Sequence, residues 1–154
     1  MSRLRNEVSK IVTRSSKDGV DTVTLDCAKI ESHCPHLVSC HHETLRLNKN
    51  GPVPRLLLED MMLDDRHLLK KGSVVHLVTE AFQLDTEIWG ADAARFNPER
   101  FLAKVSKENK KVQSQAFIPF GGGKNMCPGR HLALTEITSF VAMLGMCMLH
   151  SRRR

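Results

Sequence analysis

The sequence is poor in side chains that stack on nucleic-acid bases. It has no tyrosine and one tryptophan among its 154 residues. Its lysines are scattered among acidic residues, so the net charge of +6 is not gathered into a basic stretch with aromatic residues interleaved. Nucleic-acid-binding domains need such a concentration of charge. We therefore expect no nucleic-acid partner.

Long apolar runs and paired cysteines are also lacking. The longest nearly apolar run, residues 140–149, is far shorter than the roughly 20 residues that a membrane-spanning helix needs. The five cysteines are an odd number, and we recognise no secretory signal. A disulfide framework is therefore not expected, and a reducing compartment suits the sequence better.

The pattern of apolar residues predicts one mostly helical α+β domain with a small sheet. Helical spacing is present over residues 1–13, and the turn-forming residues 15–19 follow it. It is present again over residues 35–47, and the turn-forming residues 48–52 follow that segment. A short helix is also expected over residues 25–30. Residues 53–62 and 73–79 are predicted to be strands, and the apolar run in the second predicts burial on both faces.

The rest of the chain is predicted to contain a polar loop and a final helix. Lysine and other polar residues dominate residues 104–111, which we expect to form the loop. After Cys127, apolar residues recur at intervals of three and four, as they do along the buried stripe of a helix. We expect this stripe to face a core: Ala133, Ile137, Phe140, Val141, Leu144 and Met148.

Residues 120–129 place one cysteine between a glycine-rich turn and an apolar helix. The N–H groups at a helix start stabilise negative charge and favour the thiolate form of cysteine, which binds metals. Pro128 suits a first helical turn, and the glycines let a flat ligand approach the backbone closely. For Cys127 taken alone, a buried structural cysteine after a turn is the alternative.

The run Gly-Gly-Gly-Lys also suggests a phosphate-binding loop. That motif needs a glycine five residues before the glycine that precedes its lysine, and this chain has Ile118 there. It also needs serine or threonine after the lysine, where this chain has Asn125. The sequence therefore does not predict a phosphate-binding loop.

The spacing of Phe120, Gly123, Cys127 and Gly129 resembles the haem-binding loop of the cytochrome P450 family. The resemblance implies that haem b binds here and that Cys127 is the axial thiolate ligand of its iron, donating electron density that favours cleavage of the O–O bond. It also implies an NADPH-dependent reductase as the electron donor and a small lipophilic molecule as the substrate.

Two further segments resemble the same family. Glu43-Thr44-Leu45-Arg46 resembles its Glu-x-x-Arg helix, and residues 96–101 resemble its Pro-Glu-Arg-Phe segment. By spacing alone, Glu43 and Arg46 would be an ordinary ion pair on one face of a helix. The resemblance implies instead that Glu43, Arg46 and Arg100 form a buried charge triad, which locks the segment before the haem loop.

Arg55 and Asn125 correspond to positions from which family members contact the haem propionates. An arginine there can make charge-assisted hydrogen bonds to a carboxylate, while an ordinary exposed arginine is the alternative for Arg55. Asn125 stands where the family usually has arginine or histidine, and it brings a donor without a charge. Asparagine at this position also resembles the branch of the family that contains prostacyclin synthase.

A cluster of cysteine and histidine residues lies earlier in the chain. Its spacing lacks the Cys-x-x-Cys pair of common zinc sites, and a helix would point the side chains in different directions. We therefore do not predict zinc there. The cluster consists of Cys34, His36, Cys40, His41 and His42.

The resemblance covers only the C-terminal part of the family's fold, without its membrane anchor or its distal helix. Two hypotheses follow. In the first, the chain is a fragment of a haem-thiolate monooxygenase that inserts one oxygen atom of O2 into a lipophilic substrate, with little turnover of its own. In the second, it is a catalytically inactive haem-binding or interaction module, or a pseudogene product. Full-length relatives generally reside in the endoplasmic reticulum membrane, which does not fix the localisation of this chain.

Overall fold

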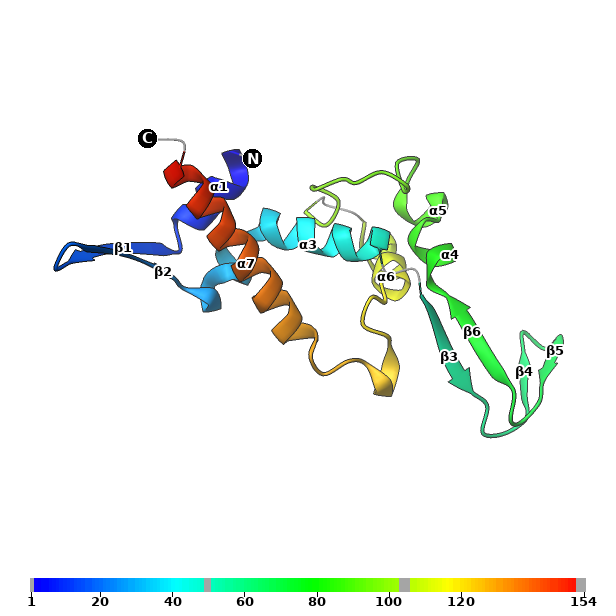
Figure 1. Cartoon of the computed structure of the whole chain (residues 1–154). Helices are drawn as coiled ribbons and strands as arrows, with labels where there is room; N and C mark the ends of the chain where they lie inside the picture. Colours follow the sequence, from blue (N-terminus) through cyan, green and yellow to red (C-terminus); the bar gives the residue numbers. More distant parts are fainter. Residues whose placement is uncertain (1, 49–50, 103–105, 152–154) are drawn as a thin grey trace.

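The computed structural model describes residues 2–48, 51–102 and 106–151, and helix α3 connects its two groups of helices (Figure 1). One group contains α1, α2 and α7, and the other contains α4, α5 and α6. Within the described residues, no helix combines the length and the apolar character needed to cross a bilayer. The helices are α1 (Ser2–Ser9), η1 (Cys27–Lys29), α2 (Ile30–His33), α3 (Pro35–Asn48), α4 (Thr79–Gln83), α5 (Thr86–Trp89), α6 (Lys107–Ala116), η2 (Gly123–Asn125) and α7 (Arg130–Ser151).

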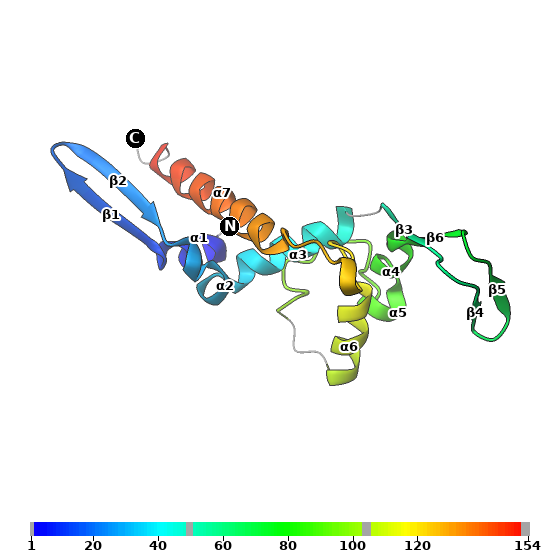
Figure 2. The ribbon, with the colours of Figure 1, turned by 90° about the horizontal axis from the view of Figure 1, so that it is seen from below.

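Two-stranded antiparallel sheets extend from the two ends of this helical body (Figure 2). The pair β1–β2 projects beside α7, while β3–β6 and β4–β5 follow one another at the opposite end. Helices with small antiparallel sheets confirm the predicted α+β class. The strands are β1 (Val12–Lys17), β2 (Val20–Leu25), β3 (Pro52–Leu56), β4 (Met61–Leu63), β5 (His67–Leu69) and β6 (Val74–Val78).

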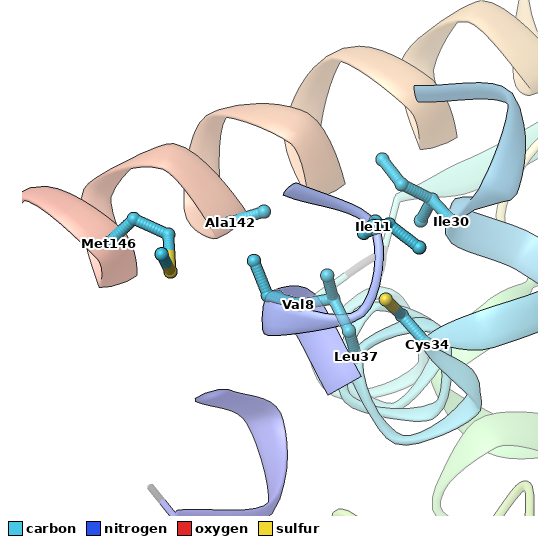
Figure 3. Close-up of a cluster of buried hydrophobic side chains, with 7 residues drawn as sticks. All are labelled: Val8, Ile11, Ile30, Cys34, Leu37, Ala142 and Met146. Carbon is cyan, nitrogen blue, oxygen red and sulfur yellow. The ribbon is translucent and has the colours of Figure 1, made fainter. Parts of the chain in front are cut away.

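The larger core joins α1, α2, α3 and α7 (Figure 3). Val8 on α1, Leu37 on α3 and Ala142 on α7 are all buried in it. The core therefore brings together helices from the start, the middle and the end of the chain. Its buried members are Val8, Ile11, Ile30, Cys34, Leu37, Ala142 and Met146.

Glu7 attaches α1 to the start of α3. Its carboxylate accepts hydrogen bonds from the backbone N–H of His36, at 3.0 and 3.1 Å, and from that of Leu37, at 3.2 Å. Both N–H groups belong to the first turn of α3, where the helix itself offers no acceptor and where negative charge is favourable. The contact therefore fixes where α3 begins relative to α1.

A smaller core packs against α3 and contains several aromatic rings. The imidazole of His42 lies 5.2 Å from the ring of Phe101 and 5.5 Å from that of Phe117, between ring centroids. The two phenylalanine rings are themselves 5.0 Å apart. Since Phe117 directly follows α6, this cluster places the start of the segment that carries Cys127. The buried members of the core are Trp89, Ala93 and Ala116.

Residues 12–25 form a β-hairpin, so the predicted helix over residues 1–13 was wrong beyond Ser9. The pairing ends with Lys17 opposite Val20, which leaves Asp18-Gly19 as a two-residue loop. Both loop residues have positive φ, 51° and 77°. Two positive φ values belong to the type I′ turn that suits twisted strands, and Asp-Gly is a preferred sequence for it. The turn-forming residues Asp18 and Gly19 therefore connect two strands.

The polar loop predicted over residues 104–111 was wrong from residue 107 onward, since residues 107–116 form helix α6. Residues 103–105 lie outside the described part of the chain. The Oγ atom of Ser106 accepts a hydrogen bond from the backbone N–H of Asn109 at 3.2 Å. Ser106 thus caps the start of α6 by accepting from a backbone N–H of its first turn. The segment is polar in composition, so the sequence pattern did not predict this helix.

Strand β6 is largely exposed, so its predicted burial on both faces was wrong. Val74 and Val78 each keep 53% of their surface exposed. In the described sheet β6 pairs with β3 alone, and an apolar strand is buried on both faces only when layers cover both of them. The single strand predicted over residues 53–62 is likewise divided between β3 and β4.

Helix α7 buries a different face from the predicted stripe. Ile137 is 46% exposed and Phe140 is 65% exposed, and the side chain of Met148 is outside those described. Apolar residues lie on several sides of this helix, so its sequence does not select one face. The buried face instead contains Thr138, Ala142 and Met146. Two of these side chains, Thr138 and Ala142, are small and allow close approach of the other helices.

Replacing Glu7 with alanine should lower the free energy of unfolding by about 1 kcal/mol, because two N–H groups of α3 lose their acceptor. Urea unfolding followed by circular dichroism measures this change. The control is Glu136→Ala, since Glu136 is an exposed glutamate on α7. Equal stability of the two variants would contradict the capping role.

Candidate functional site

The segment before α7 is a closed loop that presents Cys127. The backbone N–H of Cys127 donates to the carbonyl of Phe120 at 2.9 Å, which closes the loop. Inside it, Gly121 and Gly123 have φ values of 78° and 63°. These values lie in the left-handed region that favours glycine. The backbone thus brings Phe120, Gly123 and Cys127 together in one turn.

The thiol of Cys127 is exposed and unbonded to another cysteine. The alternative of a buried structural cysteine therefore does not describe it. A Cβ atom added at Gly129 would lie 3.7 Å from the Cys127 sulfur, and one added at Gly123 would meet nothing within 4 Å. The first helical hydrogen bond of α7 runs from the N–H of Ala133 to the carbonyl of Gly129, at 2.9 Å. The sulfur therefore lies beside a helix start, and the space at Gly123 is open.

Arg55 and Asn125 lie on separate elements. Arg55 is on β3, where its guanidinium donates to the carbonyl of Pro54 at 3.0 Å. Asn125 ends η2 and is exposed within the loop. Among the contacts of the described residues, none joins Arg55 to this loop. Instead, Arg130 contacts it, donating from Nη1 to the carbonyl of Cys127 at 3.3 Å.

On α3, Glu43 and Arg46 form a buried, bidentate ion pair. Nε of Arg46 donates to Oε2 of Glu43 at 2.8 Å, and Nη2 donates to Oε1 at 2.9 Å. Both side chains have no exposed surface. The Arg46 guanidinium also donates to the carbonyl of Gln83 and lies 5.2 Å from the centre of the Trp89 ring. These groups replace the water that a buried arginine gives up.

Arg100, from the irregular segment between α5 and α6, also binds the carboxylate of Glu43. Its Nε donates to Oε1 of Glu43 at 3.0 Å, and its side chain is only 8% exposed. Nη1 donates to the carbonyl of Trp89 at 2.6 Å and to Oδ1 of Asp92 at 3.0 Å. The backbone N–H of Asn97 also donates to Oε1 of Glu43, at 3.0 Å. Glu43, Arg46 and Arg100 thus lie together as one charge cluster.

Asp92 and Asn97 complete this cluster, and sequence reasoning did not assign them to it. The Asn97 side-chain amide donates to Oδ2 of Asp92 at 3.1 Å, while Arg100 holds the other oxygen. Both lie in an irregular segment, where no periodicity shows which side chains meet. Asn97 lies in the segment over residues 96–101 that resembles the family, but the resemblance assigned it no contact with Glu43 or Asp92.

The hydrogen bonds keep the carboxyl groups of the cluster ionised. Burial acts to raise the pKa of Glu43, but hydrogen bonds from Arg46, Asn97 and Arg100 outweigh it and lower the pKa below its ordinary value of 4.5. Hydrogen bonds from Arg100 and Asn97 likewise lower the pKa of Asp92. Burial acts to lower the pKa of Arg100, but its bonds to Asp92 and Glu43 raise that pKa overall. The cluster is therefore fully charged at neutral pH.

Comparison with known proteins decides the family. Residues 1–144 match the family model described as cytochrome P450. The chain belongs to the cytochrome P450 family. This confirms the resemblance that the loop and the Glu-x-x-Arg helix carry.

Several curated relatives align with nearly the whole chain. A cytochrome P450 monooxygenase of Gibberella zeae is 38% identical, over 94% of this chain and 28% of its own length. Cytochrome P450 monooxygenase nodJ of Hypoxylon pulicicidum is 34% identical, over 92% of this chain and 29% of its own length. Berbamunine synthase of Berberis stolonifera is 36% identical, over 94% of this chain and 28% of its own length. The chain thus spans under a third of the length of these relatives.

The residues of the loop fit the haem that the family implies. A free, exposed thiol can become the thiolate ligand, and the glycines leave the space that a flat macrocycle needs beside it. The donor chemistry and the open space at Gly123 agree with a haem-thiolate site at Cys127.

Replacing Arg100 with alanine should destabilise the chain by roughly 3–5 kcal/mol, because the carboxylate of Glu43 loses a partner inside the protein. Urea unfolding at neutral pH measures this loss. Arg95→Ala is the matched control, since Arg95 is exposed and lies in the same segment. A loss no larger than that of the control would refute a stabilising role for the cluster.

The cluster also predicts loss of stability in acid. Because the pKa of Glu43 is lower in the folded chain than its ordinary value of 4.5, its ionisation stabilises the fold above about pH 4.5. This contribution is lost as the pH falls through the folded pKa. Urea unfolding between pH 7 and pH 3 should show the difference between the native chain and Glu43→Gln shrinking toward low pH. A difference that is constant with pH would argue against an ionised Glu43.

Proposed function

We propose that this chain binds haem b through the thiolate of Cys127 and forms the haem-binding part of a cytochrome P450 monooxygenase. The free, exposed thiol at the end of a glycine-rich loop, in a chain of this family, carries the proposal. The bound haem supplies the iron that activates O2, so that one oxygen atom enters a lipophilic substrate. An NADPH-dependent reductase is the proposed electron donor.

Each residue of the loop has a distinct part in this proposal. Cys127 supplies the axial thiolate, and the Phe120 carbonyl holds its backbone through the 2.9 Å hydrogen bond. Gly123 lets the loop turn without a side chain toward the ligand, and Gly129 leaves room beside the sulfur. Asn125 donates a neutral hydrogen bond to a propionate.

Two arginine roles complete the proposal. Arg55 supplies a charged partner for a haem propionate from β3. Arg100, through Glu43, holds the segment that precedes the loop. Its removal would therefore cost haem binding as well as stability, rather than slow a chemical step.

We infer little turnover from these 154 residues alone. The chain spans under a third of the length of its curated relatives, whereas oxygen chemistry needs a site from which water is excluded. Little turnover of its own is what the first hypothesis, a fragment of a haem-thiolate monooxygenase, expects. Monooxygenase activity is proposed for a longer protein that encloses the haem.

The deciding measurement is the absorption spectrum of the reduced, haem-reconstituted chain with carbon monoxide. The chain should show a Soret band characteristic of thiolate ligation, and Cys127→Ala should lose that band, because the variant has no thiolate to offer. Cys27→Ala, which removes another exposed cysteine, should retain it. Without carbon monoxide, and with O2, NADPH, a reductase and a lipophilic test substrate present, the reconstituted chain should form little or no product.

The same band in Cys127→Ala would refute the ligand assignment. Haem uptake without a thiolate band in the native chain would refute the proposed site. Product formation by the 154 residues would refute the inferred lack of turnover and leave the ligand assignment intact.

A further inference from the structure

Helix α7 carries an exposed apolar stripe. Ile137, Phe140 and Leu144 follow one another at intervals of three and four residues, and they are 46%, 65% and 46% exposed. Ala142 and Met146, on the buried side of the helix, belong to the larger core (Figure 3). With 3.6 residues in each turn, the stripe lies on the side of α7 that faces away from this core. Apolar residues at this spacing form the seam along which one helix packs against another.

The exposed apolar surface of α7 is large enough for a stable interface. Six large apolar residues of the helix are each between 36% and 65% exposed. At about 200 Å2 for a fully exposed large side chain, they present roughly 600 Å2 in total. Two copies packed through this surface would bury about 1,200 Å2, which is the lower end of the range for stable protein interfaces. The six are Leu132, Ile137, Phe140, Val141, Met143 and Leu144.

An apolar groove lies beside the stripe, between α7 and α1. It has a volume of about 220 Å3, and Leu4 and Val8 of α1 line it together with Val141 and Gly145 of α7. A Cβ atom added at Gly145 would meet nothing within 4 Å, so this residue leaves the groove open. A cavity of about 150 Å3 can hold a benzene molecule. The groove therefore has room for one phenyl ring.

The stripe and the groove together make this surface self-complementary. Phe140 is the most exposed large apolar residue among those described on α7, and it offers the phenyl ring that the groove can hold. A dimer with two-fold symmetry needs such a surface, because each copy presents the same residues to the other. The face of α7 thus contains both halves of one contact.

We propose that two copies of this chain associate through the α7 stripe, with Phe140 of each copy bound in the α1–α7 groove of the other. The contact buries apolar surface on both copies, which is the main favourable term in protein association. None of the residues that form it is assigned to haem binding, so the dimer does not depend on the proposed function.

Sedimentation velocity of the purified 154-residue chain at increasing concentration tests the association. A reductant is present, so that the exposed Cys27 and Cys127 form no disulfides between copies. The native chain should approach twice its mass of 17.3 kDa. Phe140→Ser should raise the dissociation constant at least about tenfold, as is usual when a central aromatic residue is removed from an interface. Its far-UV circular dichroism should stay native, because this ring is exposed in the single chain.

A second variant tests the groove separately from the ring. Gly145→Leu places a side chain in the groove and should weaken association about as much as Phe140→Ser does. Each variant alone lacks both ring-in-groove contacts. In an equimolar mixture, the ring of Gly145→Leu can enter the open groove of Phe140→Ser, which restores one of the two contacts. The mixture should therefore associate more tightly than either variant by itself.

The matched control is Phe96→Ser, since Phe96 is 52% exposed and lies outside α7. This variant should dimerise as the native chain does. Equal weakening by Phe96→Ser and Phe140→Ser would overturn the proposal, because the association would then be unspecific. A mixture of Phe140→Ser and Gly145→Leu that is no tighter than its components would also overturn the proposed contact. A native chain that stays monomeric would overturn the dimer itself and leave the stripe to a segment of a longer protein.

Discussion

The buried carboxylate of Glu43 is the interaction on which the central part of the structure depends. Its Oε1 atom accepts hydrogen bonds from Arg46, from the backbone of Asn97 and from Arg100, while Oε2 accepts from Arg46. A charge with no exposed surface is tolerated only when partners replace its hydration. Helix α3 and the segment around residue 100 therefore have to meet in one arrangement.

From this carboxylate, contacts between aromatic rings lead toward the segment that carries the thiol. Phe101, which follows Arg100, packs with His42 and with Phe117, and Phe117 leads into the loop of Cys127. A charge cluster far from the sulfur in sequence is thus connected to the segment that carries it.

The parts that could be predicted are those with a fixed local spacing. Glu43 and Arg46 are three residues apart on one helix, so a shared face follows from helical geometry. The turn of Gly123 and the placement of Cys127 before a helix follow from glycine's freedom and from helix-start chemistry. The role of Asp92 could not be predicted, because it meets Arg100 across an irregular segment.

The sequence by itself determined the elements whose signals are local: helix α3, the glycine-rich loop and the cysteine at its end. Only the tertiary structure decided which face of α7 is buried, that β6 stays exposed, and that Asp92 and Asn97 join Glu43. These features depend on which other segments arrive to cover a surface or share a charge. Burial and pairing are properties of neighbours, and neighbours distant in the chain leave no periodic signal in it.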